Sequence, residues 1–84
     1  MGAGVKLPKQ GALAKFHWID ATGFIGADPT EATPAPCITI GWLQSAHRRH
    51  IVVATSLYED GTGDFTVLPI GMLTKIERIK ENEK

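Results

Sequence analysis

Alternating apolar and polar residues predict a first strand at residues 14–19. Phe16 and Trp18 fall on one face of this segment, and Lys15 and His17 fall on the other. A period of two residues is typical of a strand with one covered and one exposed face. We therefore expect the folded part of the chain to begin with a half-buried strand.

A second strand is predicted at residues 37–43, where Ile38, Ile40 and Trp42 share a face. Gly41 lies inside this segment and carries no side chain to pack. Glycine in a strand interior often marks a bulge, a bend or the close approach of another backbone. We expect one of these irregularities at Gly41.

A third strand is predicted at residues 51–58, the segment richest in residues that favour strands. Its continuous apolar start indicates burial on both faces or a contact between subunits. Residues 59–64 combine glycine with acidic residues and predict a tight turn. A short fourth strand follows at residues 65–68, and Pro69 ends it.

The last apolar segment can be interpreted in two ways. Ile70, Leu73, Ile76 and Ile79 recur every three residues, a spacing that a helix would also produce. We favour a single 3-10 turn at residues 69–72 that leads into a closing strand. A continuous helix over this segment would contradict that prediction.

These elements predict an all-β domain of five antiparallel strands at residues 13–79. We expect residues 1–12 to form a flexible arm and residues 80–84 a charged tail, because chain ends are loose unless they are tied down. Residues 20–36 form a long connection, in which one helical turn is expected at 28–32.

The end of the domain resembles a known fold. Residues 63–69, followed by Met72, Leu73 and Ile76, are similar to the strand, 3-10 turn and strand that end SH3-like barrels. The long connection after the first strand would then correspond to the long first loop of those barrels. The resemblance implies a small SH3-like β-barrel.

A second resemblance covers four segments, residues 17–20, 36–43, 51–57 and 68–73. Together they are similar to small uncharacterised proteins of tailed bacteriophages and prophages. This resemblance implies a viral origin and action in the cytoplasm of a host cell. It implies no catalytic activity.

Composition narrows the class of protein. The 84 residues suffice for one domain, and nine basic residues balance nine acidic ones. This neutrality argues against strong non-specific binding of nucleic acid, which normally needs a basic excess. Cys37 is the only cysteine, so no disulfide can form within the chain. No apolar run approaches the roughly 20 residues that span a bilayer, and we expect a cytoplasmic protein without membrane contact.

The densest positive cluster consists of His47, Arg48, Arg49 and His50. It could bind a phosphate or an acidic partner, or it could be the solvated tip of a hairpin. Neither the histidines nor Cys37 stand at the usual spacing of zinc ligands, so we expect no metal and no cofactor.

Trp18, Asp20 and Trp42 are further candidates for binding. With Tyr58 and Phe65, the tryptophans could form a stacking platform, although filling the core is the simpler expectation in so small a domain. Asp20 could pair with a basic group or bond to the backbone of the loop that follows it.

Three functions remain open. We expect a non-enzymatic accessory protein that binds a host or viral protein, as a host-takeover or anti-defence factor. The alternatives are a nucleic-acid-binding barrel, which could assemble as an Sm-like ring, and an oligomer that sequesters a small nucleotide. The apolar third strand suggests a homo-oligomer. A dimer or ring would favour the two alternatives, and a monomer would favour the accessory protein. No residues are spaced for catalysis.

Overall fold

Five β-strands and one 3-10 helix make up the part of this computed structural model that is described, residues 5–20 and 35–80. The elements in chain order are β1 (Leu13–Asp20), β2 (Ala35–Ala46), β3 (His50–Leu57), β4 (Gly63–Pro69), η2 (Ile70–Met72) and β5 (Leu73–Arg78). The prediction of an all-β chain with five strands is therefore confirmed. The helical turn expected at 28–32 lies outside the described residues.

The segment after β4 follows the predicted order of turn and strand. Pro69 is extended, with φ −63° and ψ 135°, and Leu73 returns to extended backbone with ψ 133°. The N–H of Leu73 donates to the carbonyl of Ile70 and closes the single turn of η2. The alternative of a continuous helix over this segment is excluded.

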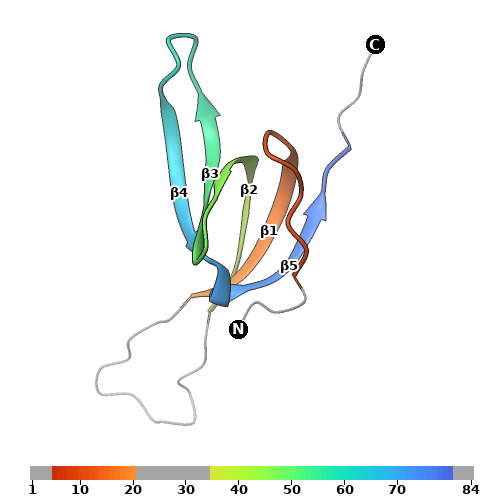
Figure 1. Cartoon of the computed structure of the whole chain (residues 1–84). Coiled ribbons are helices and arrows are strands. Elements are labelled where there is room, and N and C mark those ends of the chain that lie inside the picture. Colours follow the sequence, from red (N-terminus) through yellow and green to blue (C-terminus); the bar gives the residue numbers. More distant parts are fainter. Residues whose placement is uncertain (1–4, 21–34, 81–84) are drawn as a thin grey trace, which may run out of the picture.

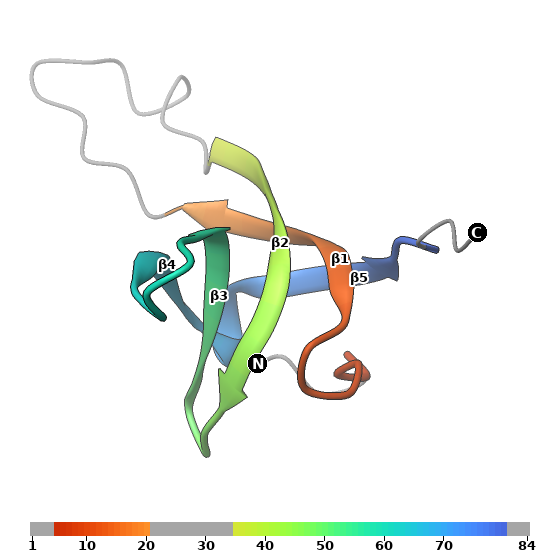
Figure 2. The same cartoon turned by 90° about the horizontal axis from the view of Figure 1, so that it is seen from above.

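All neighbouring strands pair antiparallel in one sheet, in the order β4-β3-β2-β1-β5 (Figure 1). β4 and β5 are the two ends of this order and are joined directly through η2. They do not pair with each other within the described residues, so the sheet is open. Figure 2 shows that the strands curl around a common interior.

Every strand contributes to one core. The largest fully buried side chains come from four strands and are Phe16, Leu43, Ile51, Val53 and Leu68. Leu73 of β5 is buried against the same cluster. A single sheet can bury side chains from both of its ends in one core only if it curls, which explains the shape of the molecule.

The segment before β1 also touches the core. Val5 and Leu7 are partly buried and pack against it. The N–H of Gly11 donates to the carbonyl of Leu43 at 2.7 Å, and the N–H of Leu43 donates to the carbonyl of Ala12 at 2.9 Å. These bonds continue the pairing of β1 with β2 beyond the start of β1.

Gly41 of β2 lies close against the backbone of β3. A Cβ atom at this position would collide with the carbonyl oxygen of Ala54 and lie 2.7 Å from Cγ1 of Val53. The predicted close approach of another backbone is therefore confirmed. The bulge of β2 lies a little further on, between Leu43 and Ser45.

Candidate interaction surfaces

The positive cluster lies at the hairpin between β2 and β3, as the sequence predicts. The backbone N–H of His47 donates to the carbonyl of His50 at 2.8 Å. This bond closes the turn and stacks the two imidazole rings, with centroids 4.5 Å apart and planes inclined by 23°. The hydroxyl of Ser45 lies 3.0 Å from Nε2 of His47, within hydrogen-bond distance of that ring.

Arg48 and Arg49 occupy the exposed tip of this hairpin. Neither guanidinium forms an ion pair with a carboxylate in the described part of the chain. The carbonyl of Arg49 accepts a bond of 2.9 Å from the N–H of Ile70, which fastens the hairpin to η2. The tip therefore offers two guanidinium groups to an anion from a backbone that is held in place.

The other predicted binding residues do not converge. Trp18 lies on the inner face of the sheet, half-buried, and its Nε1–H donates to Oγ1 of Thr39 at 3.0 Å. Trp42 lies on the outer face, because it precedes the buried Leu43. Asp20 is the last residue of β1 and pairs with Ala35. The two tryptophans are thus on opposite faces of the sheet and do not share one surface, whereas Trp42 and Phe65 lie in register on the outer face.

The outer surface of β2, β3 and β4 is apolar. Cross-strand pairs place Trp42, Ala54 and Phe65 in one row and Val52 beside Val67 in the next. Ile38 and Ile40 continue the outer side of β2. We call this surface the apolar face, and its exposed or half-buried members are Ile38, Ile40, Trp42, Val52, Phe65 and Val67. Ala54, which lies in register between Trp42 and Phe65, is fully buried.

Four members of the apolar face leave about half of their surface in water. The exposed fraction is 57% for Ile38, 51% for Ile40, 46% for Phe65 and 59% for Val67. Contiguous apolar surface of this kind marks interaction sites on soluble domains. Core filling is the simpler expectation for most of the four aromatic residues Trp18, Trp42, Tyr58 and Phe65. Trp18 packs against the core, whereas Tyr58 and Phe65 are 53% and 46% exposed.

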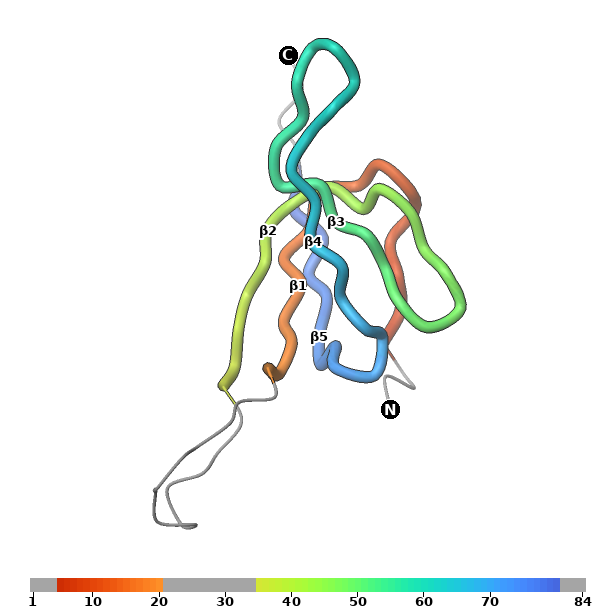
Figure 3. The backbone as a smooth tube through the Cα atoms, turned by 90° about the vertical axis from the view of Figure 1, so that its left-hand side faces the viewer, coloured from red at the N-terminus to blue at the C-terminus, as the bar shows by residue number. Residues whose placement is uncertain are grey.

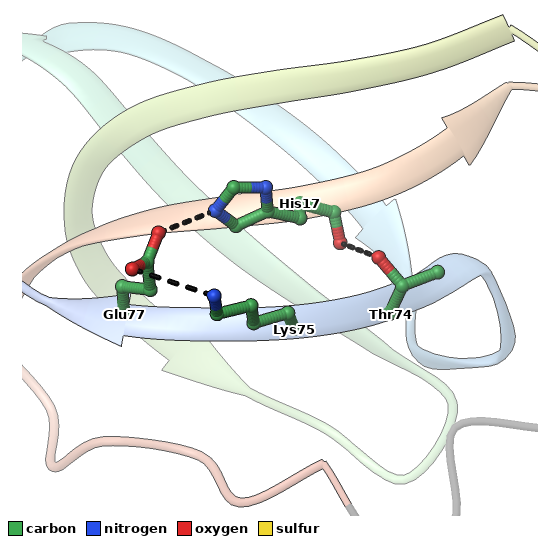
Figure 4. Close-up of polar contacts among 4 residues, drawn as sticks. All are labelled: His17, Thr74, Lys75 and Glu77. Atoms are coloured by element: carbon green, nitrogen blue, oxygen red, sulfur yellow. Dashed lines mark hydrogen bonds and ion pairs between the residues drawn. The ribbon is translucent and has the colours of Figure 1, made fainter.

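The outer surface of β1 and β5 is charged instead (Figure 4). Nε2 of His17 lies 2.7 Å from Oε1 of Glu77, and Nζ of Lys75 lies 3.6 Å from Oε2 of the same carboxylate. The hydroxyl of Thr74 donates to the carbonyl of His17 at 3.2 Å. The hydrogen bond from His17, followed by the positive charge of Lys75, lowers the pKa of Glu77 below its usual value.

The acidic turn between β3 and β4 is held by its own hydrogen bonds. Oδ1 of Asp60 accepts from the N–H and the hydroxyl of Thr62, at 2.9 and 2.7 Å, and the pKa of Asp60 is lowered by these bonds. The hydroxyl of Tyr58 donates to Oδ2 of Asp64 at 2.8 Å, and this bond, together with the negative charge of Asp64, raises the pKa of Tyr58. These contacts fit the charged hairpin tip that the sequence predicts.

The described residues hold neither a cluster of metal ligands nor a helix that could cross a membrane. Within residues 5–20 and 35–80, no three His, Cys, Asp or Glu side chains lie close enough together to hold a metal ion. Within those ranges, no helix has the length and apolar character to cross a membrane. The thiol of Cys37 is half-buried, 3.5 Å from the carbonyl of Ala35.

The chain matches no protein-family model, no curated protein and no solved structure. Its function must therefore be argued from its own surfaces. Those surfaces are the apolar face, the basic hairpin tip and the charged outer side of β1 and β5.

Proposed function

We propose that this protein is a non-enzymatic accessory protein of the phage type, which acts in the host cytoplasm by binding another protein. The apolar face carries this proposal. It is formed by three adjacent strands, and all of its members are apolar side chains. Protein interfaces have such a centre, depleted of charge and framed by polar residues.

The energetics favour a covered apolar face. Ile38 and Ile40 each expose about half of their surface. Burying on the order of 100 Å² at each residue would contribute about 2–3 kcal/mol of transfer free energy before the costs of association. A protein partner could supply this burial without a deep pocket.

The strand order supports an SH3-like barrel as the finer description of the fold. The five strands pair as β4-β3-β2-β1-β5, and a 3-10 turn joins the two ends of the sheet. This is the arrangement that the resemblance at residues 63–76 implies. An experimental structure in which η2 holds β4 and β5 at the two ends of one sheet curled around a single core would support the barrel, and a flat sheet would contradict it.

Site-specific photo-crosslinking tests the proposed partner binding. A photoreactive residue at Ile40 is expected to capture a partner from host lysate, whereas the same residue at Lys75 captures none. The capture should be lost when Ile38→Lys is added, because the lysine introduces an unpaired charge into the contact. Equal capture at both positions, or capture that survives Ile38→Lys, would contradict the proposal.

A second candidate function rests on the basic hairpin tip. Arg48 and Arg49 have no carboxylate partner in the described residues and extend from an anchored turn, so they could bind phosphate groups of a nucleic acid or of a nucleotide. Nucleic-acid binding predicts affinity that falls steeply with salt and is reduced by Arg48→Gln with Arg49→Gln. Sequestration of a nucleotide predicts a rise in melting temperature with the nucleotide alone. Lys75→Gln serves as the control for lost charge elsewhere.

A further inference from the structure

Among residues 5–20 and 35–80, β4 pairs with another strand on one side only, the side of β3. The N–H of Ile70 donates to the carbonyl of Arg49 at 2.9 Å. Arg49 and Ile70 therefore form a hydrogen-bonded pair just beyond the pairing of His50 with Pro69 in the β3–β4 ladder. Hydrogen-bonded and non-hydrogen-bonded pairs alternate along an antiparallel ladder. The N–H and C=O groups of Thr66 and Leu68 therefore point toward β3, and those of Phe65 and Val67 point away from it.

The same two residues carry exposed apolar side chains. Phe65 is 46% and Val67 is 59% exposed on the outer face of this end strand. An edge with free backbone groups and apolar side chains is a template for another strand. Natural edges are usually protected by charge or by proline, and β4 has such protection only at its ends, with Asp64 near the start and Pro69 at the finish.

We propose that β4 pairs antiparallel with β4 of a second copy of this chain, around a two-fold axis at Thr66. The proposal rests on the proposed function only in treating the apolar face as an interface. Pairing around Thr66 places Phe65 opposite Val67 of the second copy, and the reverse pair follows by symmetry. The outward backbone groups of both residues then gain hydrogen bonds, and their side chains meet on one face.

The chemistry of the other end of the sheet favours this two-fold contact. A contact between β4 and β5 of another copy would place Phe65 and Val67 beside Lys75 and Glu77. The carboxylate of Glu77 already interacts with Lys75 and with His17. Apolar side chains would then desolvate charged ones without replacing their partners. Two β4 strands match each other, and a chain with zero net charge has no overall repulsion to overcome.

The size of the contact predicts a moderate affinity. A standard interface buries about 800 Å² per partner, roughly one-eighth of the 6276 Å² surface of this chain. The edge of β4 alone is too small to bury this area. The contact would also have to include the β3–β4 hairpin, where Leu57 is 51% exposed. We expect a reversible dimer at the micromolar end of the range for interfaces of this size.

Sedimentation equilibrium at concentrations from about 5 to about 500 μM tests the dimer, since a micromolar constant falls inside that range. The wild-type mass is expected to rise from one to two chains. Val67→Lys should remain monomeric throughout, because it places a charge at the centre of the contact. Lys75→Glu, which changes charge at the opposite edge, should dimerise like the wild type. Circular dichroism and melting curves establish that both variants are folded.

Amide hydrogen exchange gives a second measurement that does not depend on one variant. In concentrated wild-type protein, the amides of Phe65 and Val67 should be protected along with those of Thr66 and Leu68. On dilution, or in Val67→Lys, the first two should lose protection and the last two should keep it. This change at alternate residues would be the signature of a strand added at the outer edge.

Three results would overturn the proposal. One is a single-chain mass at every concentration. Another is a dimer that Lys75→Glu dissociates and Val67→Lys does not. The third is a mass larger than that of a dimer, as a ring would give. A monomer that still captures a partner at Ile40 would overturn the dimer alone, and a dimer that captures no other protein would overturn only the proposed partner binding.

Discussion

The two end strands of the sheet have opposite surfaces. β4 and β5 are both short, both lie at an edge, and are joined to each other by η2. The outer side chains of β4 are Phe65 and Val67, which are apolar and about half exposed. Those of β5 are Lys75 and Glu77, which form an ion pair with each other, and Glu77 is also hydrogen-bonded to His17 of β1. Charge at an edge discourages pairing with another strand, so β5 is protected where β4 is open.

The difference between charged and apolar outer side chains extends from each edge strand to its neighbours in the sheet. β1 continues the charged surface of β5 through Lys15 and His17, whereas β2 and β3 continue the apolar surface of β4. The two regions meet along β2, which pairs with β1 at eight positions from Ala35 to Trp42 and with β3 only between Trp42 and Ala46. Figure 3 shows the end of the β3–β4 hairpin projecting beyond the other strands. The charged side chains thus interact with each other within the sheet, whereas the apolar ones remain exposed.

Gly41→Ala should lower the stability of the domain most, because Gly41 lies in β2, where the charged surface of β1 and β5 meets the apolar surface of β3 and β4. The new methyl group would collide with the carbonyl of Ala54 and crowd the side chain of Val53. Backbone cannot yield as a flexible side chain does, and we expect a loss of about 1–3 kcal/mol in the free energy of unfolding. Thermal and urea unfolding measure this loss, which corresponds to a fall of at least about 4 °C in Tm for a domain of this size.

Gly71→Ala is the matched control for that substitution. A Cβ atom at Gly71 would meet nothing within 4 Å, and its backbone is not in the left-handed region. We expect its Tm to stay close to that of the wild type. Equal destabilisation by both substitutions would mean that loss of glycine flexibility, rather than contact with β3, explains the result.

Removing the charged side chains that protect the edge of β5 should have the next largest effect, an increase in the association of the chain. Lys75→Val combined with Glu77→Val gives this edge the apolar character of β4, and a chain with two open edges can associate without limit. Light scattering should show assemblies that grow with concentration. Lys75→Gln with Glu77→Gln removes the charges but keeps polar side chains, and it should not associate in this way. A double valine variant with the wild-type mass would show that charge does not protect the edge.

The sequence predicts only part of the contrast between the apolar edge strand β4 and the charged edge strand β5. Pro69 has a fixed φ and no N–H, so it ends β4 and makes the turn into β5 predictable. Alternation in β2 places Ile38 and Ile40 on one face, but alternation alone does not say which face is covered. That choice depends on the approach of β3 at Gly41, a contact between strands that only the folded chain contains.

The candidate sites were also predictable only where they lie within one segment, and not where they depend on contacts between strands. The basic hairpin lies where its polar residues predict it, yet the stacking of His47 on His50 depends on a backbone bond across the turn. Trp18 and Trp42 occupy opposite faces because the pairing of β1 with β2 places Trp18 opposite Cys37 and Trp42 opposite Leu13. Strand register is a property of the whole sheet and could not be read from either segment alone.

The charged side of the sheet should respond to pH through Glu77. Its pKa is lowered in the folded state by the hydrogen bond from His17 and the charge of Lys75. Its contribution to stability is therefore fully present above the ordinary carboxyl value of about 4.3 and is lost as the pH falls through the lower folded value. Glu77→Gln should melt about 1–3 °C below the wild type at neutral pH, as expected for an exposed ion pair.

Melting curves between neutral and acidic pH measure that difference. The gap between wild type and Glu77→Gln should close as the pH falls through the carboxyl range, because the protonated carboxyl no longer differs in charge from the amide. Glu59→Gln, on the exposed β3–β4 turn, controls for the loss of a carboxylate that has no ion pair within the described residues. A gap that stays constant down to acidic pH would contradict the role of the charge.

Asp60→Ala should have the smallest effect, confined to the turn from which β4 starts. Oδ1 of Asp60 holds the N–H of Thr62, so its loss should speed hydrogen exchange at that amide while Tm changes little. Because the pKa of Asp60 is lowered in the fold, acid should loosen the wild-type turn but not further loosen the variant. Glu59→Ala, one residue earlier, should leave exchange at Thr62 unchanged. If Asp60→Ala also exposes the amides of Thr66 and Leu68, the turn sets the pairing of β4 with β3, and the apolar edge depends on it. If only Thr62 responds, the core holds β4 in place, and its open edge is a stable surface on which another strand can assemble.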